Sequence, residues 1–119
     1  MKKKKNPIGK TSKTSRGFGI VHFTDAYGKH CSAQCSSAID ENWNQPGAGF
    51  LWLGIDDPEP QILARQAPKL GIEQTQPDGW QPYPIPEEVS INTRMHLNRE
   101  QVQQLINRLQ QWLENGNFS

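Results

Sequence analysis

The chain has 119 residues, which is enough for one domain with a modest core. Only 34% of its residues are hydrophobic, and no apolar run approaches the ~20 residues that cross a bilayer. The lysine-rich start is not followed by the apolar segment of a secretory signal. These features exclude a membrane-spanning protein, and we expect a cytoplasmic one.

The formal net charge of +1 hides a strong asymmetry along the chain. Residues 1–17 hold seven of the 13 basic residues and none of the 12 acidic residues, so the remainder is acidic. The seven are Lys2, Lys3, Lys4, Lys5, Lys10, Lys13 and Arg16. This stretch has too few apolar side chains to offset the entropy of ordering, so we predict a disordered basic tail over 1–17 and a single domain over 18–119. The tail either solubilises the protein or makes salt-sensitive contacts with nucleic acid.

The first elements after the tail form a predicted β-hairpin. Residues 18–24 are short and rich in β-branched and aromatic side chains, which is typical of a strand. Asp25 and Gly28 occupy the first and last positions of a turn, and a second extended stretch covers 29–37. Residues 38–49 are expected to form a loop that Trp43 anchors.

The middle of the chain combines one apolar strand with a long connection. Residues 50–55 are apolar almost throughout, which favours a central strand covered on both faces. Prolines are frequent from residue 58 to residue 86, so no long helix fits beyond about residue 67. We therefore predict a long Pro-rich loop over 56–88, and loops of this length often carry function.

The end of the chain predicts a strand and a helix. Apolar and polar residues alternate over 89–97, as in a half-buried strand. Asn98 and Gln101 have the spacing of a capping box, and Gly116 stands where a left-handed C-cap belongs. One helical face is apolar, and its residues are Val102, Leu105, Ile106, Leu109, Trp112 and Leu113. The fold class is therefore α+β, with a small antiparallel sheet of about four strands and one C-terminal helix packed on it.

Two strands carry unusual rows of polar side chains. Ser32, Gln34 and Ser36 share one face of the stretch 29–37, and Arg94 and His96 share one face of the stretch 89–97. If the two strands are neighbours, these rows form one surface with hydrogen-bond donors and a cation. Such a surface suits an anionic or nucleotide-like ligand. The alternative is that both rows are solvent-exposed strand faces without a ligand.

Metal binding and thiol chemistry are weaker alternatives. His22, His30, Cys31 and Cys35 are ligand types that zinc prefers, but their spacing is not that of paired CxxC knuckles. A cysteine beside a histidine could act as a nucleophile, yet no nucleophile elbow or phosphate-binding glycine loop is present. We expect two free thiols, no metal, no cofactor and no catalytic residue.

Three segments resemble a group of small proteins encoded by tailed phages and prophages. The segments are residues 23–37, with Cys-Ser-x-Gln-x-Ser-Ser at its end, residues 51–56, and residues 93–102, with Arg-Met-His-Leu at 94–97. The resemblance covers roughly residues 18–116 and leaves the basic tail outside. It implies an accessory protein that acts in the host cell by binding.

The sequence thus predicts a non-enzymatic phage accessory protein. It would sequester a nucleotide-like signalling molecule used in defence, or block a host protein. A nucleic-acid-binding protein that uses the basic tail and a small thiol or metal-dependent enzyme are the alternatives, and a homo-oligomer is left open.

Overall fold

The structure is a computed structural model that describes residues 8–42 and 47–118. Lys2, Lys3, Lys4, Lys5 and Trp43 lie outside these residues. The chain divides into two compact units, Met1–Asp56 with Thr93–Ser119, and Asp57–Asn92. The sequence predicts instead a single domain with a long loop over 56–88.

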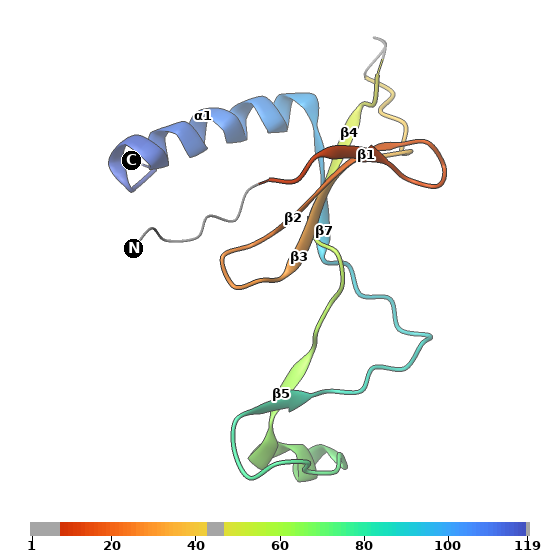
Figure 1. Cartoon of the computed structure of the whole chain (residues 1–119), viewed down its shortest axis with the longest axis vertical. Coiled ribbons are helices and arrows are strands. Elements are labelled where there is room, and N and C mark those ends of the chain that lie inside the picture. Colours follow the sequence, from red (N-terminus) through yellow and green to blue (C-terminus); the bar gives the residue numbers. More distant parts are fainter. Residues whose placement is uncertain (1–7, 43–46, 119) are drawn as a thin grey trace. The chain divides into compact units, whose positions relative to one another are not determined.

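The first unit contains a five-stranded antiparallel sheet and one helix, as Figure 1 shows. The strand order is β1-β2-β3-β4-β7, and the strands are β1 (Thr11–Lys13), β2 (Gly19–Thr24), β3 (His30–Cys35), β4 (Phe50–Ile55) and β7 (Arg94–Asn98). This arrangement confirms the predicted α+β class, an antiparallel sheet with a C-terminal helix. The β2–β3 hairpin also forms as predicted, and Asp25 closes its turn by accepting bonds from the backbone N–H groups of Tyr27 and Lys29.

Strand β1 lies inside the stretch predicted as a disordered tail. Thr11, Ser12 and Lys13 pair with β2, and the Gly9 N–H donates to the His22 carbonyl at 2.9 Å. Three exposed polar residues have no hydrophobic periodicity that would reveal a strand. Backbone hydrogen bonds to β2 supply the order, and the lysine suits a sheet edge because it opposes further strand addition.

The register gives the sheet two different faces. The Arg94 face carries the side chains of Ile20, His22, Thr24, His30, Ser32, Gln34, Phe50, Trp52, Gly54, Arg94, His96 and Asn98. The helix-side face carries those of Val21, Phe23, Cys31, Ala33, Cys35, Leu51, Leu53, Ile55, Met95 and Leu97. Strand β4 is central, as predicted, but its side chains are at best half-buried rather than covered on both faces.

Strand β7 is shorter than the predicted stretch 89–97. Its register with β4 pairs Phe50 with Asn98 and Gly54 with Arg94. Strand β4 ends one residue later, at Ile55. The alternating residues before Arg94 therefore have no partner strand, and alternation alone does not make a strand.

Helix α1 (Arg99–Asn115) has the predicted ends. Asn98 accepts a bond from the Gln101 N–H at 2.8 Å, the Gln101 side chain accepts one from the Asn98 N–H at 3.0 Å, and Gly116 adopts the left-handed conformation. The helix contacts β4 and β7, which confirms that it packs on the sheet. Leu109 and Trp112, however, remain 46% and 49% exposed, because only the start of the helix meets the sheet.

The second unit has its own short elements within the predicted loop. Strands β5 (Gln61–Leu63) and β6 (Trp80–Pro82) pair, and the 3₁₀ helix η1 (Ala64–Leu70) lies between them in sequence. Gln81 is fully buried and bonds to the Glu73 carbonyl and the Thr75 N–H. Its side chain thus orders a stretch whose composition suggested only a loop. In the part of the chain that the structure describes, no helix is long and apolar enough to span a membrane.

Candidate polar site on the Arg94 face

The two predicted polar rows lie on one face of the sheet. Across strands β3, β4 and β7, Ser32 aligns with Gly54 and Arg94, and Gln34 aligns with Trp52 and His96. Strand β4 thus separates the rows, and the long Arg94 side chain spans this gap. Its Nη1 atom donates to Ser32 Oγ at 3.1 Å and to Gln34 Oε1 at 3.3 Å.

Gly54 makes the crossing of Arg94 possible. Gly54 has a φ of +148°, and a Cβ atom at this position would lie 2.7 Å from the Thr93 carbonyl oxygen and 2.9 Å from the Arg94 Cα. Such distances are too short for any other residue. The missing side chain therefore lets β4 and β7 approach while the Arg94 side chain lies over the sheet.

The guanidinium of Arg94 is held mainly by neutral groups. Its central carbon lies 3.4 Å from the centroid of the Trp52 ring, which is a close cation–π contact. Among the described residues no carboxylate lies within ion-pair distance of Arg94. Asp56 reaches it only through the buried Ser32, whose hydroxyl donates to Asp56 Oδ1 at 2.5 Å. The other carboxylate oxygen of Asp56 lies 3.8 Å from His22 Nδ1.

Aromatic rings continue the site beside Arg94. The exposed His96 ring stacks on Trp52 with centroids 5.4 Å apart and an interplanar angle of 18°. Phe50 meets the same imidazole edge-on at 6.5 Å. Trp52 and His96 thus form a stacked pair, here called the aromatic platform, next to a cation, and the face of the His96 ring turned away from Trp52 can stack with a planar ligand.

A cavity of about 400 Å³ opens at this place. Its lining comes from the β1–β2 turn, the end of β3, and the aromatic platform, and consists of Thr14, Ser15, Arg16, Phe18, Gln34, Ser36, Ser37, Ala38, Trp52 and His96. Three of the five predicted ligand-binding residues therefore line one cavity, namely Gln34, Ser36 and His96. Ser32 and Arg94 do not line it: Arg94 contacts Gln34 and Trp52, and Ser32 accepts a hydrogen bond from Arg94.

The hydrogen bonds already made within the protein leave mainly donors for a ligand. Because the Gln34 carbonyl oxygen accepts from Arg94, its amide N–H groups remain for other partners. Ser36 Oγ accepts from the Ala38 N–H at 3.1 Å, and Thr14 Oγ1 accepts from the Phe18 N–H at 3.1 Å, so both hydroxyl hydrogens can still donate. A cavity lined by donors favours a ligand rich in acceptors.

Arg16 adds a cation that was predicted to act elsewhere. The sequence assigns Arg16 to the nucleic-acid tail, yet it lies in the β1–β2 turn, with its guanidinium carbon 5.4 Å from the Phe18 ring centroid. Lys10 and Lys13 are also described and exposed, Lys13 in the edge strand β1. Arg16 and Trp52 were missed as site residues because only the strand register brings them to Gln34.

The thiols lie on the opposite side of the sheet from the histidines. Cys31 and Cys35 belong to the helix-side face, whereas His22, His30 and His96 belong to the Arg94 face. Burial raises the pKa of the Cys31 thiol, and the nearby carboxylates of Asp25 and Asp56 raise it further. This geometry opposes both a thiol–imidazole nucleophile and a shared zinc site. Over residues 8–42 and 47–118, no three His, Cys, Asp or Glu side chains are grouped so that they could hold a metal ion.

Comparisons with protein-family models, with curated proteins and with solved structures find no match to this chain.

Proposed function

We propose that the protein acts by binding a small anionic, nucleotide-like ligand in the cavity of the Arg94 face. The observation that carries this proposal is the hydrogen bond from Arg94 to Gln34, which commits the amide oxygen and leaves the amide N–H groups as donors. Arg16 and the hydroxyls of Ser36 and Thr14 add charge and further donors around the same space. Phosphate oxygens match such a set, because they are anionic and only accept hydrogen bonds.

The aromatic platform supports a planar group beside the anion. Trp52 and His96 line the cavity with their stacked rings. A nucleobase has a π-face that stacks on such rings without requiring a particular base. A nucleotide would therefore use both parts of the site, the donors for its phosphate and the rings for its base.

The biological setting of this proposal comes from the sequence resemblance. A phage accessory protein that holds a nucleotide-like molecule could sequester a defence signal in the host cytoplasm, and blocking of a host protein is the related alternative. Neither role requires catalysis, a metal or a cofactor.

Nucleic-acid binding is a second candidate, which the position of Arg16 favours. Lys10, Lys13 and Arg16 lie in or next to the β1–β2 hairpin, and Arg16 lines the cavity together with Trp52. A single strand could place one base on the platform and its phosphates along the hairpin. Its affinity would then rise with strand length and fall steeply with salt, unlike that of a mononucleotide.

Calorimetric titration with adenosine 5′-monophosphate (AMP) and with a short oligonucleotide tests both candidates. For the nucleotide proposal, the Arg16→Ala variant should bind AMP at least about tenfold more weakly than the parent, because a charged hydrogen bond contributes about 1.5–3 kcal/mol. The matched control is Arg108→Ala, which removes an arginine from the exposed polar side of α1. Absence of AMP binding by the parent would refute the nucleotide proposal, and binding of the oligonucleotide alone would favour the second candidate.

A further inference from the structure

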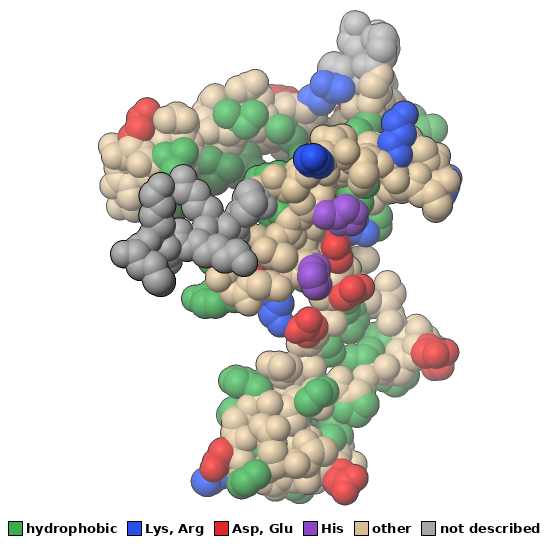
Figure 2. Space-filling view, viewed as in Figure 1, with side chains coloured by type: hydrophobic (Ala, Val, Ile, Leu, Met, Phe, Trp, Pro, Cys, Tyr) green, Lys and Arg blue, Asp and Glu red, His purple; other side chains and the backbone are tan. Residues whose placement is uncertain are grey.

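Helix α1 carries an apolar surface that the described residues of its own unit leave uncovered. Its apolar stripe consists of Val102, Leu105, Ile106, Leu109, Trp112 and Leu113, and no residue of the helix is buried. Hydrophobic side chains along the helix are visible at the molecular surface (Figure 2). Val102 and Leu105 are half-buried, Ile106, Leu109 and Trp112 are 46–52% exposed, and Leu113 is 70% exposed.

The helix-side face of the sheet is incompletely covered as well. Met95 and Ile55 are exposed, and Val21, Phe23 and Leu53 are only half-buried. Among the described residues no Val, Leu, Met, Phe or Trp side chain is buried. The sheet and the helix of one copy therefore bury each other's apolar surfaces only in part.

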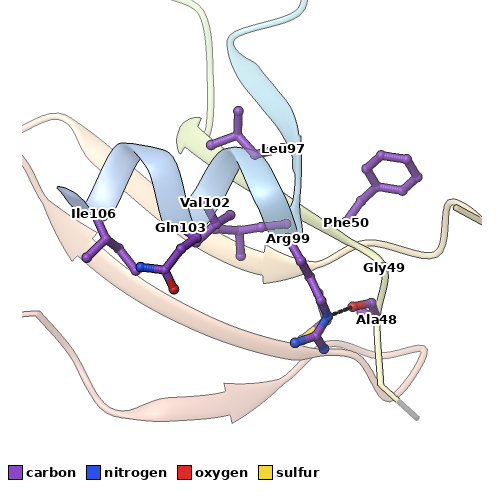
Figure 3. A pocket seen from close by; sticks show the side chains of 10 residues that line it. Ala48, Gly49, Phe50, Leu97, Arg99, Val102, Gln103 and Ile106 are labelled. Atoms are coloured by element: carbon purple, nitrogen blue, oxygen red, sulfur yellow. Dashed lines mark hydrogen bonds between the residues drawn. The ribbon is translucent and has the colours of Figure 1, made fainter. Parts of the chain in front are cut away.

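The two surfaces meet only where the helix begins. Leu51 and Leu97 of the sheet and Val102 and Ile106 of the helix line an apolar cavity of about 400 Å³, with Cys35 at one side. Figure 3 shows Arg99 donating to the Ala48 carbonyl beside this cavity. The start of α1 is thus fixed, while its later turns extend away from this contact (Figure 1). The stripe residues on these later turns are exposed.

We propose that a second copy of this chain covers these surfaces, with the apolar stripe of each α1 packed on the helix-side face of its partner. Each copy has one apolar helix stripe and one apolar sheet face. In a two-fold dimer, the helix of each copy covers the sheet face of the other, so all four apolar surfaces are buried at once. Monomeric proteins rarely expose apolar patches above a few hundred Å², and a standard interface buries about 800 Å² on each partner. Six large apolar side chains of the stripe and the sheet face are 36–70% exposed, namely Ile55, Met95, Ile106, Leu109, Trp112 and Leu113. Together they offer an apolar area of the order that a dimer interface buries, whereas a small ligand would cover only part of it.

The mass in solution tests this proposal directly. Native mass spectrometry and light scattering of the full chain should give twice the monomer mass of 13.5 kDa. The melting temperature should rise with protein concentration, because dimerisation stabilises the folded state by mass action. A monomer mass at about 100 µM, or a melting temperature independent of concentration, would overturn the proposal.

A pair of lysine variants separates the interface from the fold. Leu113 is 70% exposed in a single copy, so Leu113→Lys fits the folded chain but places a charge in the proposed interface. Asn107→Lys places the same charge on the opposite side of the helix. Leu113→Lys should weaken dimerisation by at least about tenfold and keep the helical circular dichroism, whereas Asn107→Lys should change neither. A Leu113→Lys dimer as stable as the parent dimer would contradict the proposed packing.

Discussion

Arg94 and Gln34, which are 60 residues apart in the sequence, share a 3.3 Å hydrogen bond that joins the two polar rows of the sheet. The guanidinium is the donor, so the amide oxygen of Gln34 must be the acceptor. Arg94 thus orients the side chain of Gln34, which lines the cavity, while Arg94 does not line it. In the proposed site Arg94 would therefore position Gln34, whereas the sequence predicts direct contact of Arg94 with the ligand.

Replacement of Arg94 should therefore affect both stability and binding. Arg94→Ala leaves the buried Ser32 hydroxyl and the Gln34 carbonyl without their donor, so we expect a loss of about 1–3 kcal/mol in the free energy of unfolding. Arg94→Lys should recover part of this loss, since an ammonium group donates but does not reproduce the planar contact with Trp52. Urea unfolding measures the stability, and AMP titration of the folded variants measures the binding. Unchanged stability in Arg94→Ala would mean that the observed hydrogen bonds contribute nothing to the fold.

The close approach of β4 to β7 predicts an unusual cost at Gly54. Gly54→Ala combines an unfavourable φ with contacts to the backbone of Thr93 and Arg94, so it should destabilise the sheet by more than about 1 kcal/mol. Gly28→Ala is the matched control, because Gly28 has a φ of +85° and open space where a Cβ atom would lie. Thermal melting compares the two. An equal fall in melting temperature for both variants would show that the path of the Arg94 side chain over β4 does not depend on the missing side chain at Gly54.

The β1–β2 pairing makes the first residues relevant to stability. Deletion of residues 1–16 removes the backbone partners of β2 along one edge, so the melting temperature should fall, whereas a disordered tail would leave it unchanged. Deletion of residues 1–8 is the control, because it keeps Gly9 and all of β1. The longer deletion should also weaken AMP binding, since it removes Thr14, Ser15 and Arg16 from the cavity.

The two thiols should differ strongly in reactivity. The Cys31 thiol is buried and has a pKa above its usual value of 9.0, whereas Cys35 is exposed in a single copy. In a sample dilute enough to be monomeric, iodoacetamide should therefore modify Cys35 at least about tenfold faster at pH 8. Because the pKa of Cys31 is raised in the folded state, its contribution to stability is complete below pH 9.0 and is lost as pH rises through the folded pKa. Peptide mass spectrometry after timed alkylation measures the two rates. Equal rates would contradict the burial of Cys31.

Local patterns predict those parts of the fold that local chemistry determines. The capping box of Asn98 and Gln101, the Asp25 turn and the bounds of β4 follow directly from side-chain type and spacing. Strand β1 does not, because its order comes from the backbone of β2. The exposure of Leu109 and Trp112 could not be predicted either, since an apolar stripe indicates that a surface is covered but not by what.

The candidate site shows the same division. The alternation of side chains along a strand predicts that Ser32 and Gln34 share one face, and likewise Arg94 and His96. Only the pairing of both strands with β4 shows that the two rows lie on the same surface. Trp52, between the rows, belongs to the stretch 50–55 that the sequence predicts as a central strand covered on both faces, and Arg16 belongs to the predicted tail. The residues that neighbour Trp52 and Arg16 in the sequence form no pattern that would predict the cavity.

The most direct test of the proposed ligand site is AMP titration of Gln34→Glu. This change keeps the size of the side chain and its acceptor for Arg94, but replaces the donating amide with a carboxylate that repels an anion. Gln111→Glu is the matched control, because Gln111 also accepts from an arginine, Arg108, at 3.3 Å and lies on the polar side of α1. We predict that Gln34→Glu melts at or above the parent temperature and binds AMP at least about tenfold more weakly, while Gln111→Glu binds like the parent. Parent-like affinity in a folded Gln34→Glu variant would contradict the proposed site.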